Sequence, residues 1–172
     1  MTSMVHFSST TDLWETPPEL FARLDEEFHF TLDACAVPAN AQCRRFFSLP
    51  HQDGLKQKWS GTCWMNPPDG RTIGLWMRKA WEESRRGVTV VCLTPARTDT
   101  AWFQNYAARG EVRFLRGRLK FSNSKSSAPF PSAVVVFRAA PIAYILEARY
   151  ENANILPPDD SIKFLNSQIQ GD

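Results

Sequence analysis

The chain has 172 residues, of which 43% are hydrophobic and 22% are charged, and its formal net charge is only +2. These values are typical of one ordinary globular domain with a real core, and they exclude a binder that relies on bulk positive charge, so any basic surface must come from local clustering. No apolar run approaches the length of a membrane span, and the polar start lacks the apolar core of a signal peptide, so we expect a cytoplasmic protein.

The cysteines and histidines give no sign of a metal site. Cys35, Cys43, Cys63 and Cys92 lack the close spacing of zinc ligands, and the three histidines are scattered. Cys63 and Cys92 fall in expected buried strands, where cysteine behaves as a small hydrophobe. We therefore expect structural thiols and no metal.

The first expected element is a helix that begins near Thr16. Thr16 is a candidate N-cap, Pro17 suits the first helical position, and Glu19 would complete a capping box. Trp14 lies just before this start and could either pack on the helix or project toward a ligand. The apolar face of the helix consists of Leu20, Phe21, Leu24 and Phe28.

Residues 30–36 predict a short strand that ends in Asp33 and small side chains. Asp33 could hold the amine of a cofactor or could cap a loop. The glycine-rich dinucleotide fingerprint is absent, which argues against an ordinary NAD site. Residues 37–58 indicate irregular structure with at most a short strand at 46–47, and residues 53–55 indicate a turn.

Residues 61–70 predict a strand that ends in a proline-stiffened turn, Asn66-Pro67-Pro68-Asp69-Gly70. Loops beyond the carboxyl ends of strands are where ligands bind in open α/β sheets. Asn66 offers a side-chain carbonyl, and the two prolines remove N–H donors and leave bare carbonyls. Such acceptors suit a substrate amine, although the same residues are also common in an ordinary tight turn.

A helix to about residue 86 follows the turn, and residues 88–93 then predict a strand buried on both faces. We expect a polar loop over residues 94–100, a helix that ends near residue 110, and strands at 111–115 and 132–137. The helix expected after Pro141 and the tail beyond it look peripheral.

The segment between the last two strands, residues 116–131, is rich in positive charge and carries two phenylalanines. Arginine and lysine contacts to phosphates, together with aromatic stacking on bases, would use such a segment to bind DNA. The alternative is a solvated basic loop. The candidate DNA-binding residues, with Arg97 beside the central turn, are Arg97, Arg116, Arg118, Lys120, Lys125 and Phe130.

Several of these stretches, taken together and in order, resemble the phage-type DNA N6-adenine methyltransferase family. They cover roughly residues 12–138 and include Trp-Glu-Thr-Pro at 14–17, Phe-Thr-Leu-Asp-Ala-Cys-Ala at 30–36, Asp-Gly-Leu at 53–55, Trp-Met-Asn-Pro-Pro at 64–68, Pro-Ala-Arg-Thr-Asp-Thr at 95–100, Arg-Gly-Arg-Leu-Lys-Phe at 116–121 and Ala-Pro-Phe-Pro-Ser at 128–132. The resemblance implies a phage or prophage protein of a bacterial host.

The resemblance implies an α/β, Rossmann-like class I methyltransferase with a mostly parallel central sheet and helices on both faces. It implies a flexible N-terminus at residues 1–11, a methyltransferase domain at 12–140 and a peripheral extension at 141–172. It also implies S-adenosylmethionine as methyl donor and adenine in double-stranded DNA as acceptor, and it leaves the oligomeric state open.

Residue roles follow from the same resemblance. The catalytic turn would consist of Asn66, Pro67, Pro68 and Asp69. The cofactor would be bound by Trp14, Thr16, Pro17, Asp33, Ala34, Cys35 and Ala36, with Asp53 near its adenosine. Asn66 and the carbonyl of Pro67 would accept the two N6 hydrogens of a base that has left the duplex.

Position 69 departs from the family pattern. The family's motif has an aromatic residue, usually Tyr, that stacks on the flipped base, whereas this chain has Asp69. Two other hypotheses therefore stay open: a DNA-binding member with weakened or lost turnover, and an amino-group methyltransferase that acts on protein or RNA.

Overall fold

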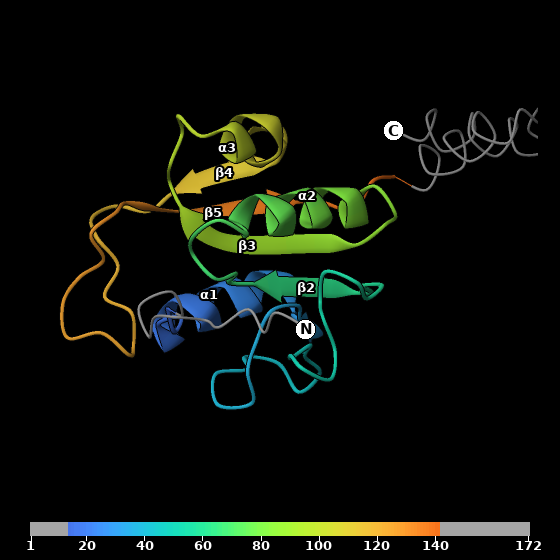
Figure 1. Cartoon of the computed structure of the whole chain (residues 1–172), viewed down its shortest axis with the longest axis horizontal. Coiled ribbons are helices and arrows are strands. Elements are labelled where there is room, and N and C mark those ends of the chain that lie inside the picture. Colours follow the sequence, from blue (N-terminus) through green and yellow to red (C-terminus); the bar gives the residue numbers. More distant parts are fainter. Residues whose placement is uncertain (1–13, 142–172) are drawn as a thin grey trace, which may run out of the picture.

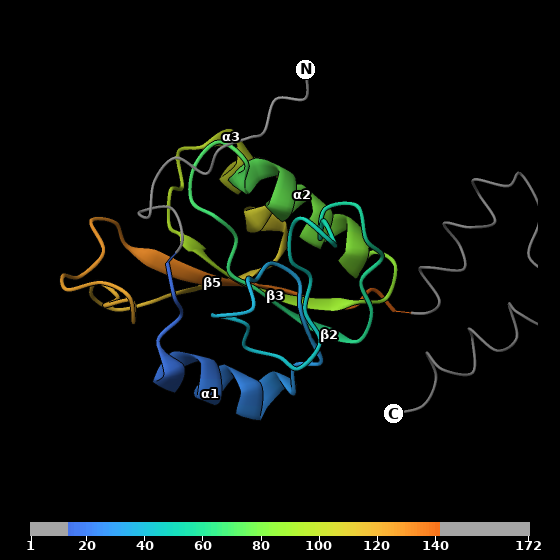
Figure 2. The same cartoon turned by 60° about the horizontal axis from the view of Figure 1, so that its bottom comes forward.

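A computed structural model describes residues 14–141 as a five-stranded sheet with helices on both faces (Figures 1 and 2). The expected flexible residues 1–11 and the helix expected after Pro141 lie outside the described residues. In chain order the elements are α1 (Pro18–Phe28), β1 (Leu32–Asp33), β2 (Thr62–Met65), α2 (Ile73–Ser84), β3 (Thr89–Pro95), α3 (Ala101–Asn105), the 3-10 helix η1 (Ala107–Arg109), β4 (Glu111–Phe114) and β5 (Ser132–Phe137).

The sheet is mixed, so the expectation of a mostly parallel sheet is wrong. Its order is β1-β2-β3-β5-β4; β1, β2 and β3 pair in parallel, whereas β5 pairs antiparallel with both β3 and β4. The physical reason lies in the connections. A helical crossover joins β2 to β3, but β4 and β5 are joined by a loop that simply turns back, and such a connection yields antiparallel neighbours.

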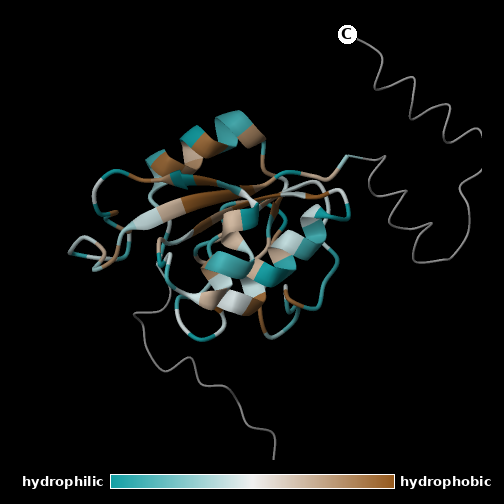
Figure 3. Ribbon diagram, turned by 90° about the horizontal axis from the view of Figure 1, so that it is seen from above, coloured by the Kyte–Doolittle hydropathy of each residue, from teal (hydrophilic) through white to brown (hydrophobic). Residues whose placement is uncertain are grey.

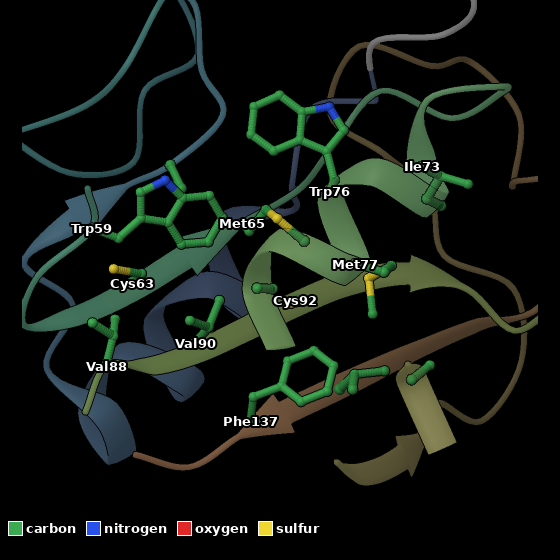
Figure 4. Close-up of a cluster of buried hydrophobic side chains, with 14 of the residues drawn as sticks. Trp59, Cys63, Met65, Ile73, Trp76, Met77, Val88, Val90, Cys92 and Phe137 are labelled. Carbon is green, nitrogen blue, oxygen red and sulfur yellow. The ribbon is translucent and has the colours of Figure 1, made fainter. Parts of the chain in front are cut away.

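Alternation along the strands divides the core into two layers. Val91 and Leu93 of β3 pack toward α1, while Val90 and Cys92 pack toward α2 and α3. The strands are largely hydrophobic, whereas the helices carry both hydrophobic and hydrophilic residues (Figure 3). On the second face, Trp76 and Met77 of α2 lie over the sheet (Figure 4). The helices on both faces confirm that part of the expected architecture.

The start of α1 differs from the sequence prediction. Pro17, not Thr16, occupies the N-cap, and no side chain there caps the helix. Thr16 is buried, and its hydroxyl oxygen accepts a hydrogen bond from the Asn66 amide instead. A capping box is a local pattern, and here a contact between residues fifty positions apart takes its place.

The first strand is also shorter than predicted, covering only Leu32–Asp33. The Asp33 carboxylate accepts hydrogen bonds from the backbone N–H groups of Cys35 and Gln42, which bend the chain away from the sheet. Residues 45–47 then return beside Asp33 through a parallel bridge at Phe46, so the short strand expected there is confirmed as a bridge.

The cysteines are free thiols in the described residues, and two of them lie in the core as predicted. Cys63 of β2 and Cys92 of β3 are fully buried. Burial raises the pKa of the Cys63 thiol to about 12 and that of Cys92 well above its ordinary value. Between residues 14 and 141, no helix is long and apolar enough to cross a membrane.

Candidate functional site

The carboxyl ends of β1, β2 and β3 meet at one edge of the sheet because these strands run parallel. The chain leaves them at Ala34, Asn66 and Ala96. The loop between β4 and β5 projects beyond the same edge, at the left of Figure 1. The predicted catalytic turn, the predicted cofactor strand and the basic loop therefore share one side of the molecule.

The side chain of Asn66 has a defined orientation. Its Nδ2 donates to the backbone carbonyl of Trp14 at 2.5 Å and to Oγ1 of Thr16 at 3.1 Å. A backbone carbonyl can only accept, so the amide nitrogen must be the end that faces Trp14. Both Asn66 donors are thus used within the protein, and its Oδ1 remains as the acceptor for a ligand.

Asn66 and its neighbour Pro67 line a small pocket at this edge of the sheet. Pro67 is buried, whereas Pro68 and Asp69 are partly exposed. The turn, the end of β3 and the loop after β4 all contribute to the wall. The lining residues are Trp14, Asn66, Pro67, Asp69, Leu93, Thr94, Pro95, Phe121 and Phe130.

Three aromatic rings form one side of this pocket. The ring of Trp14 lies 4.9 Å from that of Phe121 and 5.7 Å from that of Phe130, centroid to centroid. Phe121 is buried, but Trp14 and Phe130 are partly exposed. A planar, uncharged heterocycle is the kind of ligand that such a wall accepts.

Asp69 lies in the same wall and joins the turn to the loop after β3. Its Oδ2 is 3.1 Å from Nη2 of Arg97, whose guanidinium carbon lies 5.8 Å from the centre of the Phe130 ring. The other oxygen, Oδ1, is buried and has no hydrogen-bond partner in the described part of the chain. A ligand with an N–H donor would satisfy this oxygen.

At the end of β1, two carboxylates surround Cys35. Asp33 is almost fully buried, and this burial raises its pKa to about 6 against the two backbone hydrogen bonds that lower it. Burial raises the pKa of the Cys35 thiol, and the charges of Asp33 and Asp53 raise it further. Cys35 is therefore a neutral thiol and no nucleophile.

The predicted turn after Asp53 is confirmed, and its glycine has a steric reason. The N–H of Lys56 donates to the Asp53 carbonyl. A Cβ on Gly54 would lie 2.2 Å from the Ala34 carbonyl oxygen, so only glycine allows this loop to approach β1. The approach places Asp53 beside residues 33–36.

This end of β1 fits a cationic cofactor. No Lys or Arg within residues 14–141 forms an ion pair with Asp33, so its buried carboxylate has only N–H donors as partners. Asp53 keeps about a quarter of its side chain exposed and has one exposed partner, Lys56, at 3.5 Å. Within the same residues, no cluster of three His, Cys, Asp or Glu side chains is placed to hold a metal ion.

The basic loop, residues 116–131, is held in place by packing and hydrogen bonds, whereas its charged side chains are exposed. Phe121 and Ala128 are buried against α1 and β5, and the Ala128 N–H donates to the Leu119 carbonyl at 2.7 Å. Backbone and side-chain bonds from Ser122 and Asn123 also hold residues 15–16. The exposed cations are Arg116, Arg118, Lys120 and Lys125.

The structure brings five predicted site residues into one pocket: Trp14, Asn66, Pro67, Asp69 and Phe130. The predicted cofactor residues at 33–36 and 53 lie together at the neighbouring strand end, and Thr16 connects the two regions through Asn66. Sequence reasoning did not assign Leu93, Thr94, Pro95 or Phe121 to the site. The position of residues 93–95 at a strand's carboxyl end was the available signal for them, and the aromatic residues of the basic segment 116–131 were the signal for Phe121.

Comparisons with known proteins identify a matching family and two relatives of this chain. Residues 5–153 match the model of a family described as DNA N-6-adenine-methyltransferase (Dam). A protein of Haemophilus phage HP1 named DNA N-6-adenine-methyltransferase is 32% identical over 123 residues, which cover 69% of this chain and 70% of that protein. A protein of Escherichia phage T1 with the same name is 36% identical over 95 residues, or 54% of this chain, but the match spans only 39% of its length.

Proposed function

The chain belongs to the DNA N-6-adenine-methyltransferase (Dam) family, and from this premise we propose that it transfers a methyl group from S-adenosylmethionine to N6 of adenine in double-stranded DNA. We also propose that its α/β sheet is a Rossmann-like class I methyltransferase fold, in which β5 and β4 form the antiparallel end of the sheet. The orientation of Asn66 is the observation that carries the functional proposal.

Asn66 and Pro67 provide two acceptors for one amino group. Because Nδ2 of Asn66 is held by Trp14 and Thr16, Oδ1 is available to accept one N6 hydrogen. The carbonyl of Pro67 accepts the other, and Pro68, which has no N–H, offers no competing donor. Hydrogen bonds to both hydrogens would hold the amino group in place and leave its nitrogen lone pair free to react. The chain thus acts by positioning and electrostatics, without a covalent nucleophile.

The cofactor-binding residues in this proposal are those at the end of β1, together with Trp14, Thr16, Pro17 and Asp53. When bound, S-adenosylmethionine supplies an electrophilic methyl group on a sulfonium centre. The carboxylates of Asp33 and Asp53 would favour its positive charges, because Asp33 lacks a cationic partner in the described residues.

The DNA-binding surface in this proposal is the basic loop. The four exposed cations would contact phosphates and thereby hold the duplex over the pocket. The target base must leave the stack to reach Asn66, and the aromatic wall would receive it. Arg97 is paired with Asp69 in this structure, so we expect it to act mainly at the pocket, and less in binding phosphates than the four exposed cations.

The experiment is a methyl-transfer assay with purified protein, S-adenosylmethionine and duplex DNA, followed by nucleoside mass spectrometry. We expect N6-methyladenine with the natural protein and none above background with Asn66→Ala. Parallel reactions with RNA and with protein substrates test the alternative acceptors. Methylated RNA, methylated protein or N4-methylcytosine in place of N6-methyladenine would refute the proposal, as would DNA binding with no transfer to any acceptor.

A further inference from the structure

We propose that Phe130 is the stacking ring for the flipped base, and that Asp69 positions it through Arg97. This inference rests on the proposed function, because it concerns the base that the pocket receives. Asp69 would then be a positioning residue, although it occupies the place where the family has an aromatic residue. The stacking surface would come from the loop between β4 and β5 instead of from the turn itself.

Burial excludes most of the other rings near the turn. Trp64 packs in the layer toward α1, and Trp76 packs in the layer toward α2, so neither offers a free face. Phe121 is also buried, at 3% exposure. Trp14 and Phe130 remain, since both line the pocket and both are partly exposed.

The contacts of these two rings distinguish them. Trp14 packs closely on Phe121, and its backbone carbonyl holds Asn66, so it supports the catalytic side chain. Phe130 meets Trp14 edge to face, at an interplanar angle of 87°. It lies between Pro129 and Pro131 on the basic loop, where restricted backbone angles favour a fixed ring position.

Arg97 links Phe130 to the catalytic turn. Its guanidinium lies over the Phe130 ring and pairs with Asp69 Oδ2, so it contacts residues on two different loops. Lysine could supply the charge but not the planar fork that stacks on a ring while it pairs with a carboxylate. Asp69 therefore holds Arg97, and Arg97 holds Phe130 in the pocket wall.

The first test measures stacking and turnover in Phe130 variants. Losing a base-stacking ring is expected to lower kcat/KM for duplex DNA about tenfold to a hundredfold in Phe130→Leu, while Phe130→Tyr retains most of it. Duplex DNA with 2-aminopurine at the target position reports stacking directly, because its fluorescence rises on leaving the helix and is quenched by an aromatic neighbour. We expect the bound 2-aminopurine to be brighter with Phe130→Leu than with the natural protein or Phe130→Tyr.

The matched control is Phe114→Leu, which makes the same change at a phenylalanine that is 65% exposed and lies outside the pocket. We expect it to leave the fluorescence unchanged. Cofactor affinity, measured by calorimetry, should be retained in the variants of Phe130, Asp69, Arg97 and Phe114, since none of these four residues belongs to the proposed cofactor-binding set.

The second test measures the link from Asp69 to Phe130. If Asp69 acts through Arg97, then Asp69→Ala and Arg97→Gln should each brighten the bound 2-aminopurine, and neither should add to the effect of Phe130→Leu. Additive effects would show that Asp69 acts independently of the ring, and would overturn the link.

Two outcomes would overturn the assignment of the ring itself. One is equal fluorescence and turnover for Phe130→Leu and the natural protein. The other is a fluorescence increase in Trp14→Leu alone. Because the fluorescence comparison needs DNA binding and base flipping but no methyl transfer, it remains informative even if the natural protein yields no N6-methyladenine. Failure of the proposed function and failure of this inference are therefore separate results.

Discussion

Replacing Thr16 by valine would remove one of the two hydrogen bonds that orient Asn66 while preserving the shape of the side chain. Thr16 is 4% exposed, and its Oγ1 accepts from Asn66 Nδ2 at 3.1 Å. One hydrogen bond contributes about 0.5–1.5 kcal/mol net. If all of this hydrogen-bond energy serves to stabilise the transition state by orienting Asn66, kcat should fall roughly twofold to twelvefold in Thr16→Val, since about 1.4 kcal/mol corresponds to a factor of ten. The bond to Trp14 would remain and limit the loss.

The assay is steady-state methylation of a duplex oligonucleotide, with cofactor affinity measured separately by calorimetry. Thr16→Ser is the matched control, because it keeps the hydroxyl and should retain most of kcat. We expect kcat at saturating cofactor to fall in Thr16→Val, beyond any loss of cofactor affinity. An unchanged kcat in that variant, or an equal loss in Thr16→Ser, would refute the argument that the hydroxyl orients Asn66. Loss of cofactor affinity with an unchanged kcat would limit Thr16 to its proposed role at the cofactor.

Three further predictions concern other parts of the molecule. Burial raises the Asp33 pKa from 3.8 to about 6, so the protonated carboxyl favours folding; its contribution to the free energy of unfolding is present below about pH 4 and is lost as the pH rises through 6. Urea titrations should show this pH dependence, up to about 3 kcal/mol, in the natural protein and not in Asp33→Asn. Arg118→Ala and Lys120→Ala should each weaken duplex binding and lower its salt slope by about one unit, measured by fluorescence anisotropy, whereas an unchanged slope would mean that the loop is only solvated surface. Glu83 is buried 2.6 Å from Lys79, so Glu83→Ala should lower the free energy of unfolding by about 3 kcal/mol in the same titrations, and a change below 1 kcal/mol would contradict the importance of this pair.

The parts of the fold that could be predicted from the sequence are those set by local patterns. A strand, a proline-rich turn and an apolar helical face follow one another at residues 61–84, and each leaves its own periodicity or turn signature. The strand over 132–137 was equally readable. Its place between β3 and β4 was not, because strand order depends on which edges pair and leaves no trace in a single segment.

The candidate site also combines residues that the sequence predicts with contacts that it does not. Asn66 and Pro67 were identified from their turn and its position after a strand. The pairing of Asp69 with Arg97 joins residues 28 positions apart, and the contact of Trp14 with Phe130 joins opposite ends of the domain. No local rule predicts such contacts. Thr16 shows how a local rule can mislead, since its hydroxyl serves Asn66 and not the helix.

The two thiols enclosed in the central strands have a practical consequence. Cys63 and Cys92 are fully buried, and their raised pKa keeps them as unreactive thiols while β2 and β3 stay paired. An alkylating reagent can modify them only after this part of the sheet has opened. Their labelling rate therefore reports how often the layer beneath the proposed catalytic turn separates, with no introduced probe. A ligand that stabilises the turn would slow this labelling.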